Sequence, residues 1–158
     1  MDIFIADIKY LESYREFLFN CFSGGLEKYE SALNDPKRYL QSLIADAENT
    51  STHFCIQDGE VLGAIRCRHH TSTYIENVIG HVGYETKPTV RGKGVAKFML
   101  SWIQENVLQN SIIITCEADN SASQRVIESC GAKYINQIYS PEKNSEVKRF
   151  KLGGLVEL

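Results

Sequence analysis

The sequence predicts one α/β domain built on a mixed β-sheet, and three observations carry that prediction. A length of 158 residues suits a single domain, so residues 1–158 are taken as one unit. Segments with the alternating hydrophobic pattern of strands and segments with helical spacing follow one another along the chain. The unbroken apolar run Ile112 to Ile114 indicates a strand that is buried on both faces and pairs in parallel through a helical crossover.

The first half of the chain predicts two helices between short strands. A pair of glycines ends the first helix, and Asp35 followed by Pro36 is typical of the start of the second. Asp58 and Gly59 separate two extended runs and are a strong signal for an antiparallel hairpin. The expected elements are strand 2–6, helix 9–22, helix 36–47, strand 53–57 and strand 61–68.

The second half is predicted around a central unit of strand, glycine-rich turn and helix. Residues 77–87 alternate, so that His81 and Glu85 share one face of a strand that Pro88 ends. Apolar residues at helical spacing follow from 95 to 107. The remaining expected elements are strand 111–117, a short helix capped by Asp119 or Asn120 and ended by Gly131, and a hairpin of strands 132–139 and 147–152.

The glycine-rich turn has the composition of a phosphate-binding loop. A helix N-terminus presents backbone N–H groups at the positive end of the helix dipole, and glycines allow close approach of a ligand. A Walker A loop requires Gly-Lys-Ser/Thr, but Lys93 is followed by Gly94. A dinucleotide fingerprint requires a third glycine where this chain has Lys97. The run Arg91 to Ala96 therefore either binds phosphate in another way or is an ordinary basic turn.

Composition argues against several classes of protein. The net charge is −3 and the basic residues are dispersed, which argues against a nucleic-acid partner. No apolar run approaches the ~20 residues of a membrane span and no signal peptide is visible, so we expect a cytoplasmic protein without a membrane partner. Five scattered cysteines form no Cys-x-x-Cys pair, and the Cys-Arg-His-His run at 67–70 lacks further ligands at a recognised spacing. We therefore expect no metal site.

Two motifs resemble those of the GNAT family of N-acetyltransferases. The stretch Arg91–Ala96, RGKGVA, fits the pattern Arg/Gln-x-x-Gly-x-Gly/Ala of the family's coenzyme A pyrophosphate loop. The stretch Asn120–Ser123, followed by Gly131, is similar to the family's Asn-x-x-Ala/Ser motif. The run from Gly80 to Arg91 is similar to a branch known mostly as predicted acetyltransferases. The resemblance covers nearly the whole chain and implies a mostly antiparallel mixed sheet with a splayed central pair of parallel strands and flanking helices.

The resemblance also implies acetyl-CoA as co-substrate and assigns its contacts. The strand before the turn would hold the pantetheine arm through its backbone, the amides of the turn would hold the pyrophosphate, and Asn120 would hydrogen-bond the arm. The implied cofactor-binding residues are Tyr84, Glu85, Thr86, Arg91, Gly92, Lys93, Gly94, Val95, Ala96, Asn120 and Ser123. A backbone N–H near Glu85 would face the thioester oxygen and stabilise the negative charge that develops on it.

The implied reaction is direct attack of a primary amine on the acetyl group, and it needs a proton acceptor near the amine. His81 and Glu85 are candidates, about 13 Å apart on one strand face, and Glu117 at the end of the next strand is a third. An imidazole with an ordinary pKa of about 6.5 suits proton transfer at neutral pH, whereas an imidazole bonded to backbone would be structural. The residues leave the choice open.

One position departs from the family pattern. Many members have a tyrosine seven residues after the motif asparagine, where it acts as general acid, but Ile127 stands at that position here. Tyr134, Tyr139 or water would then protonate the leaving thiolate. A rival interpretation is an acetyl-CoA-binding sensor or partner module with lost or weak turnover. The predicted acceptor is a small-molecule or peptide amine, and a homodimer remains open.

Overall fold

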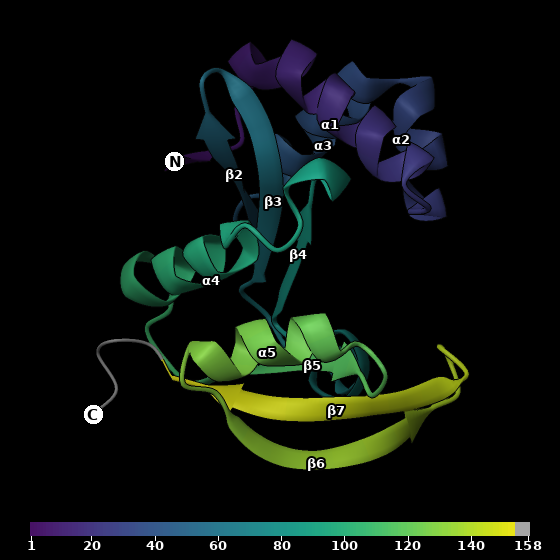
Figure 1. Ribbon diagram of the computed structural model, residues 1–158, viewed down its shortest axis with the longest axis vertical. Coiled ribbons are helices and arrows are strands. Elements are labelled where there is room, and N and C mark those ends of the chain that lie inside the picture. The colour runs from purple at the N-terminus through teal and green to yellow at the C-terminus, as the bar shows by residue number, and fades with distance from the viewer. Residues whose placement is uncertain (154–158) are drawn as a thin grey trace. The chain divides into compact units, whose positions relative to one another are not determined.

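The computed structural model describes residues 1–153 and divides into two compact units (Figure 1). The first unit contains residues 1–66 and 84–99, and the second contains residues 67–83 and the chain from residue 100 on. Both combine antiparallel β-structure with helices, which confirms the predicted mixed α/β class. Residues 154–158 of the predicted domain lie outside the described part, and the single-domain organisation stays a prediction.

The first unit is built on a four-stranded sheet. Its strands, in order across the sheet, are β1 (Asp2–Ile5), β2 (Thr50–Gln57), β3 (Glu60–Arg68) and β4 (Val82–Thr86). The ends of β3 and β4 at 67–68 and 82–83 belong to the second unit. Asp58 (φ 53°) and Gly59 (φ 76°) both adopt left-handed backbone. Such a two-residue turn matches the twist of the strands beside it, and the predicted hairpin is confirmed.

Helical segments fill the chain between β1 and β2, and another helix follows β4. They are η1 (Ile8–Tyr10), α1 (Leu11–Ser23), η2 (Glu27–Tyr29), α2 (Glu30–Asn34), α3 (Pro36–Ala45), η4 (Pro88–Val90) and α4 (Val95–Asn106). Asp35 caps α3 as predicted, because its side chain accepts the Arg38 N–H at 3.1 Å. The elements η2 and α2 are not predicted from the sequence, since elements this short show no helical period.

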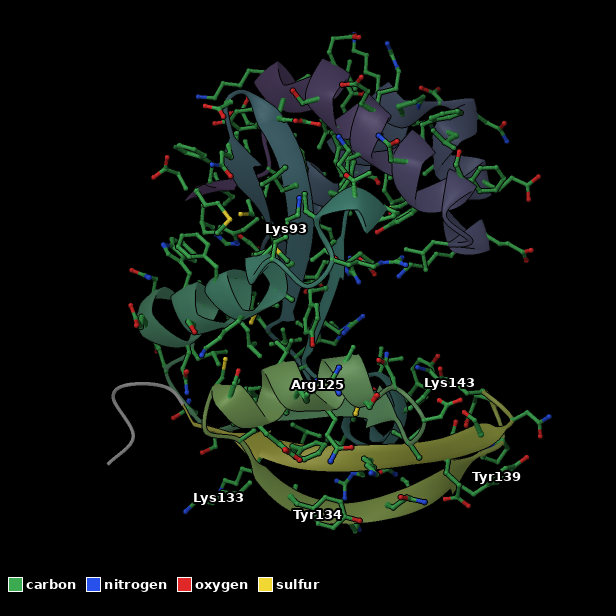
Figure 2. All side chains as sticks on the ribbon, in the orientation of Figure 1. Lys93, Arg125, Lys133, Tyr134, Tyr139 and Lys143 are labelled. Atoms are coloured by element: carbon green, nitrogen blue, oxygen red, sulfur yellow. The ribbon has the colours of Figure 1, made fainter. Side chains whose placement is uncertain are left out.

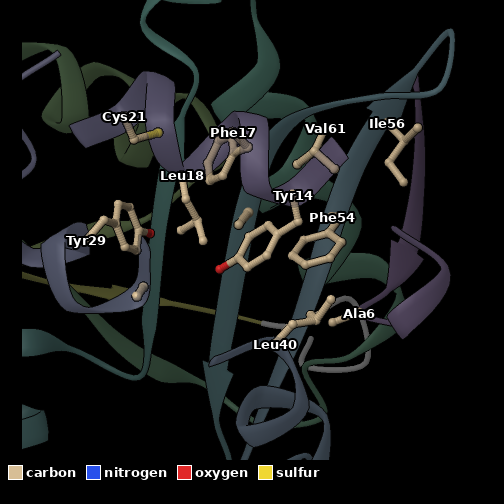
Figure 3. Close-up of a cluster of buried hydrophobic side chains, with 12 residues drawn as sticks. Ala6, Tyr14, Phe17, Leu18, Cys21, Tyr29, Leu40, Phe54, Ile56 and Val61 are labelled. Carbon is tan, nitrogen blue, oxygen red and sulfur yellow. The ribbon is translucent and has the colours of Figure 1, made fainter. Parts of the chain in front are cut away.

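Tyr14 lies at the centre of the core of the first unit (Figure 3). Its ring stacks on Phe54 with centroids 4.5 Å apart and on Phe17 with centroids 5.9 Å apart. These rings come from α1 and β2, so the helix is fixed to the sheet by aromatic packing. The buried cluster comprises Ala6, Tyr14, Phe17, Leu18, Cys21, Tyr29, Ala32, Leu40, Phe54, Ile56, Val61 and Ala64.

The second unit is built on a three-stranded antiparallel sheet. Its strands, in order across the sheet, are β5 (Ile112–Glu117), β7 (Ser145–Leu152) and β6 (Lys133–Ser140). Helix α5 (Ser121–Ser129) follows β5, and Asn120 caps it by accepting the Ser123 N–H at 3.1 Å. Ile127 of α5 and Phe150 of β7 are fully buried in the core of this unit. The predicted C-terminal hairpin is confirmed.

The predicted strand over residues 77–87 is wrong in its first half. Residues Ile75–Ile79 form a π-helical turn, η3, which is closed by the Gly80 N–H donating to the Ile75 carbonyl at 2.7 Å. Gly80 has a φ of 72°, and a Cβ there would lie 3.1 Å from the carbonyl of Ile113. A left-handed glycine in close contact with another segment therefore interrupts the alternating pattern, and β4 begins only at Val82.

The predicted parallel pairing of β4 with β5 is not confirmed. Within the described residues β4 is paired with β3, and β5 is paired antiparallel with β7, where Ile114 lies opposite Phe150. Only Ile114 and Cys116 of β5 are buried. The isoleucine run therefore reflects an amphipathic edge strand rather than a strand that is covered on both faces.

Candidate active site

One continuous segment of the first unit carries most of the predicted cofactor contacts. The Lys87 N–H donates to the Leu62 carbonyl at 2.8 Å, and this bond sets the register of β4 on β3. The same register places the carbonyl of Glu85 toward β3, where it lies 3.2 Å from the Cβ position of Gly63. Backbone groups alternate in direction along a strand, so those of Tyr84 and Thr86 point away from β3.

This register gives the direction of the Glu85 backbone, for which a contact with the cofactor is predicted. The N–H of Glu85 faces the ladder with β3, so the N–H groups on the side away from β3 are those of Tyr84 and Thr86. The Thr86 carbonyl accepts the thiol of Cys21 at 3.9 Å. Burial raises the pKa of that thiol to about 11, so Cys21 stays protonated and donates. A ligand that paired with this edge of β4 as an added strand would therefore have the Thr86 N–H as a hydrogen-bond donor.

The loop before α4 is exposed and has two left-handed glycines, Gly92 (φ 76°) and Gly94 (φ 83°). A Cβ added at either glycine would meet nothing within 4 Å. The Lys93 N–H donates to the Val90 carbonyl at 3.2 Å, which folds the loop back on η4. In the described chain neither glycine N–H has a backbone acceptor, and the Lys93 side chain projects from the same loop (Figure 2).

Glu85 is surrounded by donors from two elements of the first unit, β3 and η2. Arg66 on β3 binds both carboxylate oxygens, each at 2.7 Å. The Tyr29 hydroxyl donates to Oε2 at 2.8 Å, and the Lys28 ammonium forms an ion pair with Oε1. Only 8% of the Glu85 side chain is exposed, and 19% of the Arg66 side chain. The carboxylate is thus buried and saturated with donors.

The surroundings of Glu85 set its charge state. Burial alone would raise the pKa of the carboxyl, but the bonds and charge of Arg66, followed by the charge of Lys28, lower it to about 2. Burial and the carboxylate charge raise the pKa of Tyr29, so its hydroxyl stays a donor. Glu85 is therefore ionised at neutral pH and holds a proton very weakly, which argues against the predicted role as general base.

His81 lies in the second unit, just before β4, and both of its ring nitrogens are engaged. The Ile113 N–H donates to Nδ1 at 3.0 Å, and Nε2 lies 3.0 Å from the Thr71 hydroxyl, which donates to Glu76 at 3.1 Å. Nε2 therefore carries the proton, and burial lowers the pKa of the imidazole. Accepting a further proton requires breaking the bond to Ile113, which argues against the predicted role as base.

Glu117 is half-buried at the end of β5. Ser145 donates to its Oε1 at 3.2 Å, and its backbone carbonyl accepts the Asn120 N–H at 2.9 Å. Glu117 and Asn120 are therefore close together at the end of β5, whereas His81 is bonded to Ile113, about 13 Å away along the strand. The Asn120 Oδ1 is used by the helix cap, so a contact with a cofactor falls to its Nδ2.

Sequence reasoning missed the partners of Glu85. Lys28 and Tyr29 come from η2 and Arg66 from β3, and both segments are far from Glu85 in the sequence. A usable signal was present, since an arginine on one predicted strand and a glutamate on another can form a diagonal cross-strand pair. Finding it requires the register of β3 and β4, which the sequence leaves undetermined.

The other chemistry-bearing residues in residues 1–153 are less informative. All five cysteines are free, and burial raises the pKa of Cys116. No group of three or more His, Cys, Asp or Glu side chains that could hold a metal ion occurs in this part of the chain. Ile127, where the family pattern has an acid, is fully buried. Every helix in the same part is too short or too polar to traverse a lipid bilayer.

The two units thus contain an antiparallel edge strand, a glycine loop at a helix N-terminus and an asparagine-capped helix, the parts of a coenzyme A-dependent acyltransferase. The profile of the family described as Acetyltransferase (GNAT) domain matches residues 14–133, which is more than half of the chain. This chain belongs to the GNAT acetyltransferase family. No curated protein gives a significant match by sequence.

Solved structures show the same fold at low sequence identity. The ribosomal L7/L12 α-N-protein acetyltransferase RimL in complex with coenzyme A has a TM-score of 0.76 at 12% identity, over 98% of this chain and 94% of that one. The microcin C7 self-immunity acetyltransferase MccE with acetyl-CoA and AMP gives 0.75 at 15% identity, over 96% and 92%. A variant of spermidine N-acetyltransferase SpeG from Vibrio cholerae gives 0.68 at 14% identity, over 97% and 95%.

Family membership confirms the recognition made from the two motifs. It also confirms the predictions of an acyltransferase and of acetyl-CoA as its co-substrate. The acceptor differs among the similar structures, which include enzymes named for a ribosomal protein and for spermidine. The fold is therefore compatible with acceptors of different chemistry.

Proposed function

We propose that this protein transfers the acetyl group of acetyl-CoA to a primary amine by direct attack of the amine. The observation that carries the proposal is the loop before α4, where Gly92 and Gly94 adopt left-handed backbone in open space. Glycine adopts this backbone at no steric cost. The absence of a Cβ also leaves room for a pyrophosphate beside the first N–H groups of the helix. The proposed pyrophosphate contacts are N–H groups of the run Arg91–Ala96 that have no backbone acceptor in the described chain, among them those of Gly92 and Gly94.

The strand before the loop supports the same placement of the cofactor. The backbone of Tyr84 and Thr86 points away from β3, and β4 has no second strand partner in the described chain. A pantetheine arm would add to this edge as a further strand would, with the Thr86 N–H as a donor. Asn120 and Ser123 of the second motif would contribute further polar contacts.

The reaction requires removal of one proton and addition of another. The amine nitrogen attacks the acetyl carbonyl, the carbon–sulfur bond breaks, coenzyme A leaves as a thiolate, and the amine gives up a proton. Of the three predicted bases, Glu117 alone has a carboxylate oxygen, Oε2, that accepts no hydrogen bond within residues 1–153. We therefore favour Glu117, acting directly or through water, over Glu85 and His81. Water or a tyrosine would protonate the thiolate, since Ile127 cannot.

Calorimetry with coenzyme A tests the cofactor site. Gly94→Asp places a negative charge beside the pyrophosphate and is expected to weaken binding by about tenfold or more. Gly94→Ala introduces the same backbone strain without the charge and should weaken binding less. Gly59→Asp, at a left-handed glycine (φ 76°) with equally open space, is the matched control for strain and charge elsewhere in the unit. Equal binding by folded Gly94→Asp and Gly59→Asp would refute the assignment of this loop.

Release of free thiol separates an enzyme from a cofactor-binding sensor. Wild-type protein is incubated with acetyl-CoA and a panel of amines that includes amino acids, polyamines, aminoglycosides and peptide N-termini. The proposal expects release with at least one amine and a reduction of about a hundredfold or more in Glu117→Gln, within the usual range for loss of a general base. Tight binding of coenzyme A without release from any amine would favour the sensor.

A further inference from the structure

The Glu85 carboxylate has three fixed donors and one exchangeable donor. Arg66 contributes two bonds from β3, and the Tyr29 hydroxyl contributes a third from a residue that is 3% exposed. The fourth donor is the Lys28 ammonium, whose side chain is 53% exposed. Lys28 lies on η2, a segment of only three residues. This donor can therefore leave the carboxylate without disturbing a strand or a long helix.

The position of the Lys28 ammonium is suited to a primary ammonium ion. The Lys28 Nζ atom is paired with the Glu85 carboxylate and lies 5.3 Å from the centroid of the Tyr29 ring. A carboxylate and an aromatic ring together attract a cation more strongly than either alone. Since more than half of the Lys28 side chain is exposed, a cation from solvent can reach the place that this side chain now occupies.

An ammonium held at this place stays charged. Arg66 occupies both oxygens of Glu85 in a bidentate arrangement, so the carboxylate is a poor acceptor for a proton. Attack on a thioester requires a neutral amine. The position therefore suits a group that binds but does not react, and the reacting amine must be a different nitrogen of the same acceptor.

We propose that the place filled by the Lys28 ammonium is a recognition site for the second ammonium group of a diamine or polyamine acceptor. The acceptor displaces Lys28 and pairs with Glu85 and Tyr29, while its other amine reaches the acetyl group. The exchange replaces one cation by another, so the buried Arg66–Glu85 pair keeps its charge balance. This inference rests on the proposed function, because Glu85 lies between Tyr84 and Thr86 on the strand proposed to hold the cofactor.

The first test compares diamines with monoamines. Thiol release is measured for α,ω-diaminoalkanes of three to eight carbons and for the 1-aminoalkane of each length. We expect at least one diamine to exceed its matched monoamine in kcat/KM by about tenfold, the effect of one hydrogen bond between charged groups. Release from monoamines with no diamine preferred would overturn the inference and leave the proposed function standing.

The second test removes the competing ammonium. Lys28→Met should lower KM for the preferred diamine by about two- to fivefold, the effect of a partly exposed ion pair, with kcat and the monoamine KM unchanged. Lys9→Met is the matched control, because the Lys9 ammonium lies 5.3 Å from the centroid of the Tyr10 ring but forms no ion pair within residues 1–153. An equal KM in the two variants would also overturn the inference.

Failure of the proposed function has a different signature. If no amine releases thiol although coenzyme A binds, the transferase proposal fails before the diamine question arises. Glu85→Gln adds a third measurement where circular dichroism shows that it folds. The ratio of its kcat/KM for the diamine to that for the matched monoamine should fall to about one, and a ratio that stays at the wild-type value would overturn the inference.

Discussion

Glu85 and His81 are four residues apart, and the structure surrounds them in opposite ways. Glu85 is buried, ionised and held by donors from Arg66, Tyr29 and Lys28. His81 is only partly buried and neutral, and a backbone N–H fills the lone pair of its Nδ1. Each side chain has the chemistry of a proton acceptor, but its acceptor atoms already accept hydrogen bonds from other groups of the protein. Suitability as a base thus depends on the neighbours of a side chain more than on its type.

The largest expected effect is on the Glu85 side of this comparison. Arg66→Met leaves a buried carboxylate without its bidentate partner and should lower the free energy of unfolding by about 3–5 kcal/mol in urea titrations. Arg15→Met is the matched control, because Arg15 also binds both oxygens of a glutamate, Glu12, at 3.0 Å, but with 48% and 81% of the two side chains exposed.

The exposed Arg15–Glu12 pair should contribute at most about 1 kcal/mol to the free energy of unfolding. If Arg66→Met and Arg15→Met lose the same small amount, water reaches Glu85 and the description of a saturated buried carboxylate is wrong.

The two side chains should also affect stability in different ranges of pH. The pKa of Glu85 falls from an ordinary 4.5 to about 2, so its stabilisation is complete above about pH 4.5 and is lost as the pH falls toward 2. That shift corresponds to about 3 kcal/mol. The pKa of His81 is lowered from 6.5, so its stabilisation is present above pH 6.5 and is lost as the pH falls through the lowered pKa.

Unfolding free energies measured from pH 8 to pH 2 test both windows. Glu85→Gln should flatten the curve below pH 4.5 and leave the region above it parallel to wild type. His81→Asn should remove the slope that begins below pH 6.5. A Glu85→Gln curve that stays parallel to wild type down to pH 2 would show that this carboxyl does not titrate abnormally.

The same contrast explains which parts of the site could be predicted from sequence. The loop from Arg91 to Ala96 and the cap formed by Asn120 are each contiguous in the sequence, and their backbone geometry follows from glycine and from a short polar side chain. The cluster around Glu85 brings together η2, β3 and β4. Which residues meet in this cluster depends on the register of β3 and β4 and on the position of the three-residue segment η2. Neither property produces a periodic pattern in the sequence.

The errors in the predicted fold have a related cause. Hydrophobic alternation from 77 to 81 suggested a strand, but the left-handed backbone of Gly80 and the bond from its N–H to Ile75 turn those residues into η3. The run Ile112 to Ile114 suggested a strand covered on both faces, yet only Ile114 is buried. The burial of a strand and the strands that it pairs with depend on the packing of the whole fold. An apolar run is therefore compatible with more than one arrangement.

The smallest expected effect distinguishes two roles for His81. An asparagine Oδ1 can take the place of the imidazole Nδ1 and accept the Ile113 N–H, whereas a glutamine places its oxygen closer to where Nε2 lies. His81→Gln should therefore lose about 1–2 kcal/mol of unfolding free energy, and His81→Asn clearly less. Neither amide titrates, so a base at this position would make both variants equally slow and remove the acidic limb of the pH–rate profile. A positioning role instead predicts that His81→Asn keeps both the turnover and the acidic limb of the wild type. Equal loss of turnover in two folded variants would restore His81 as the base.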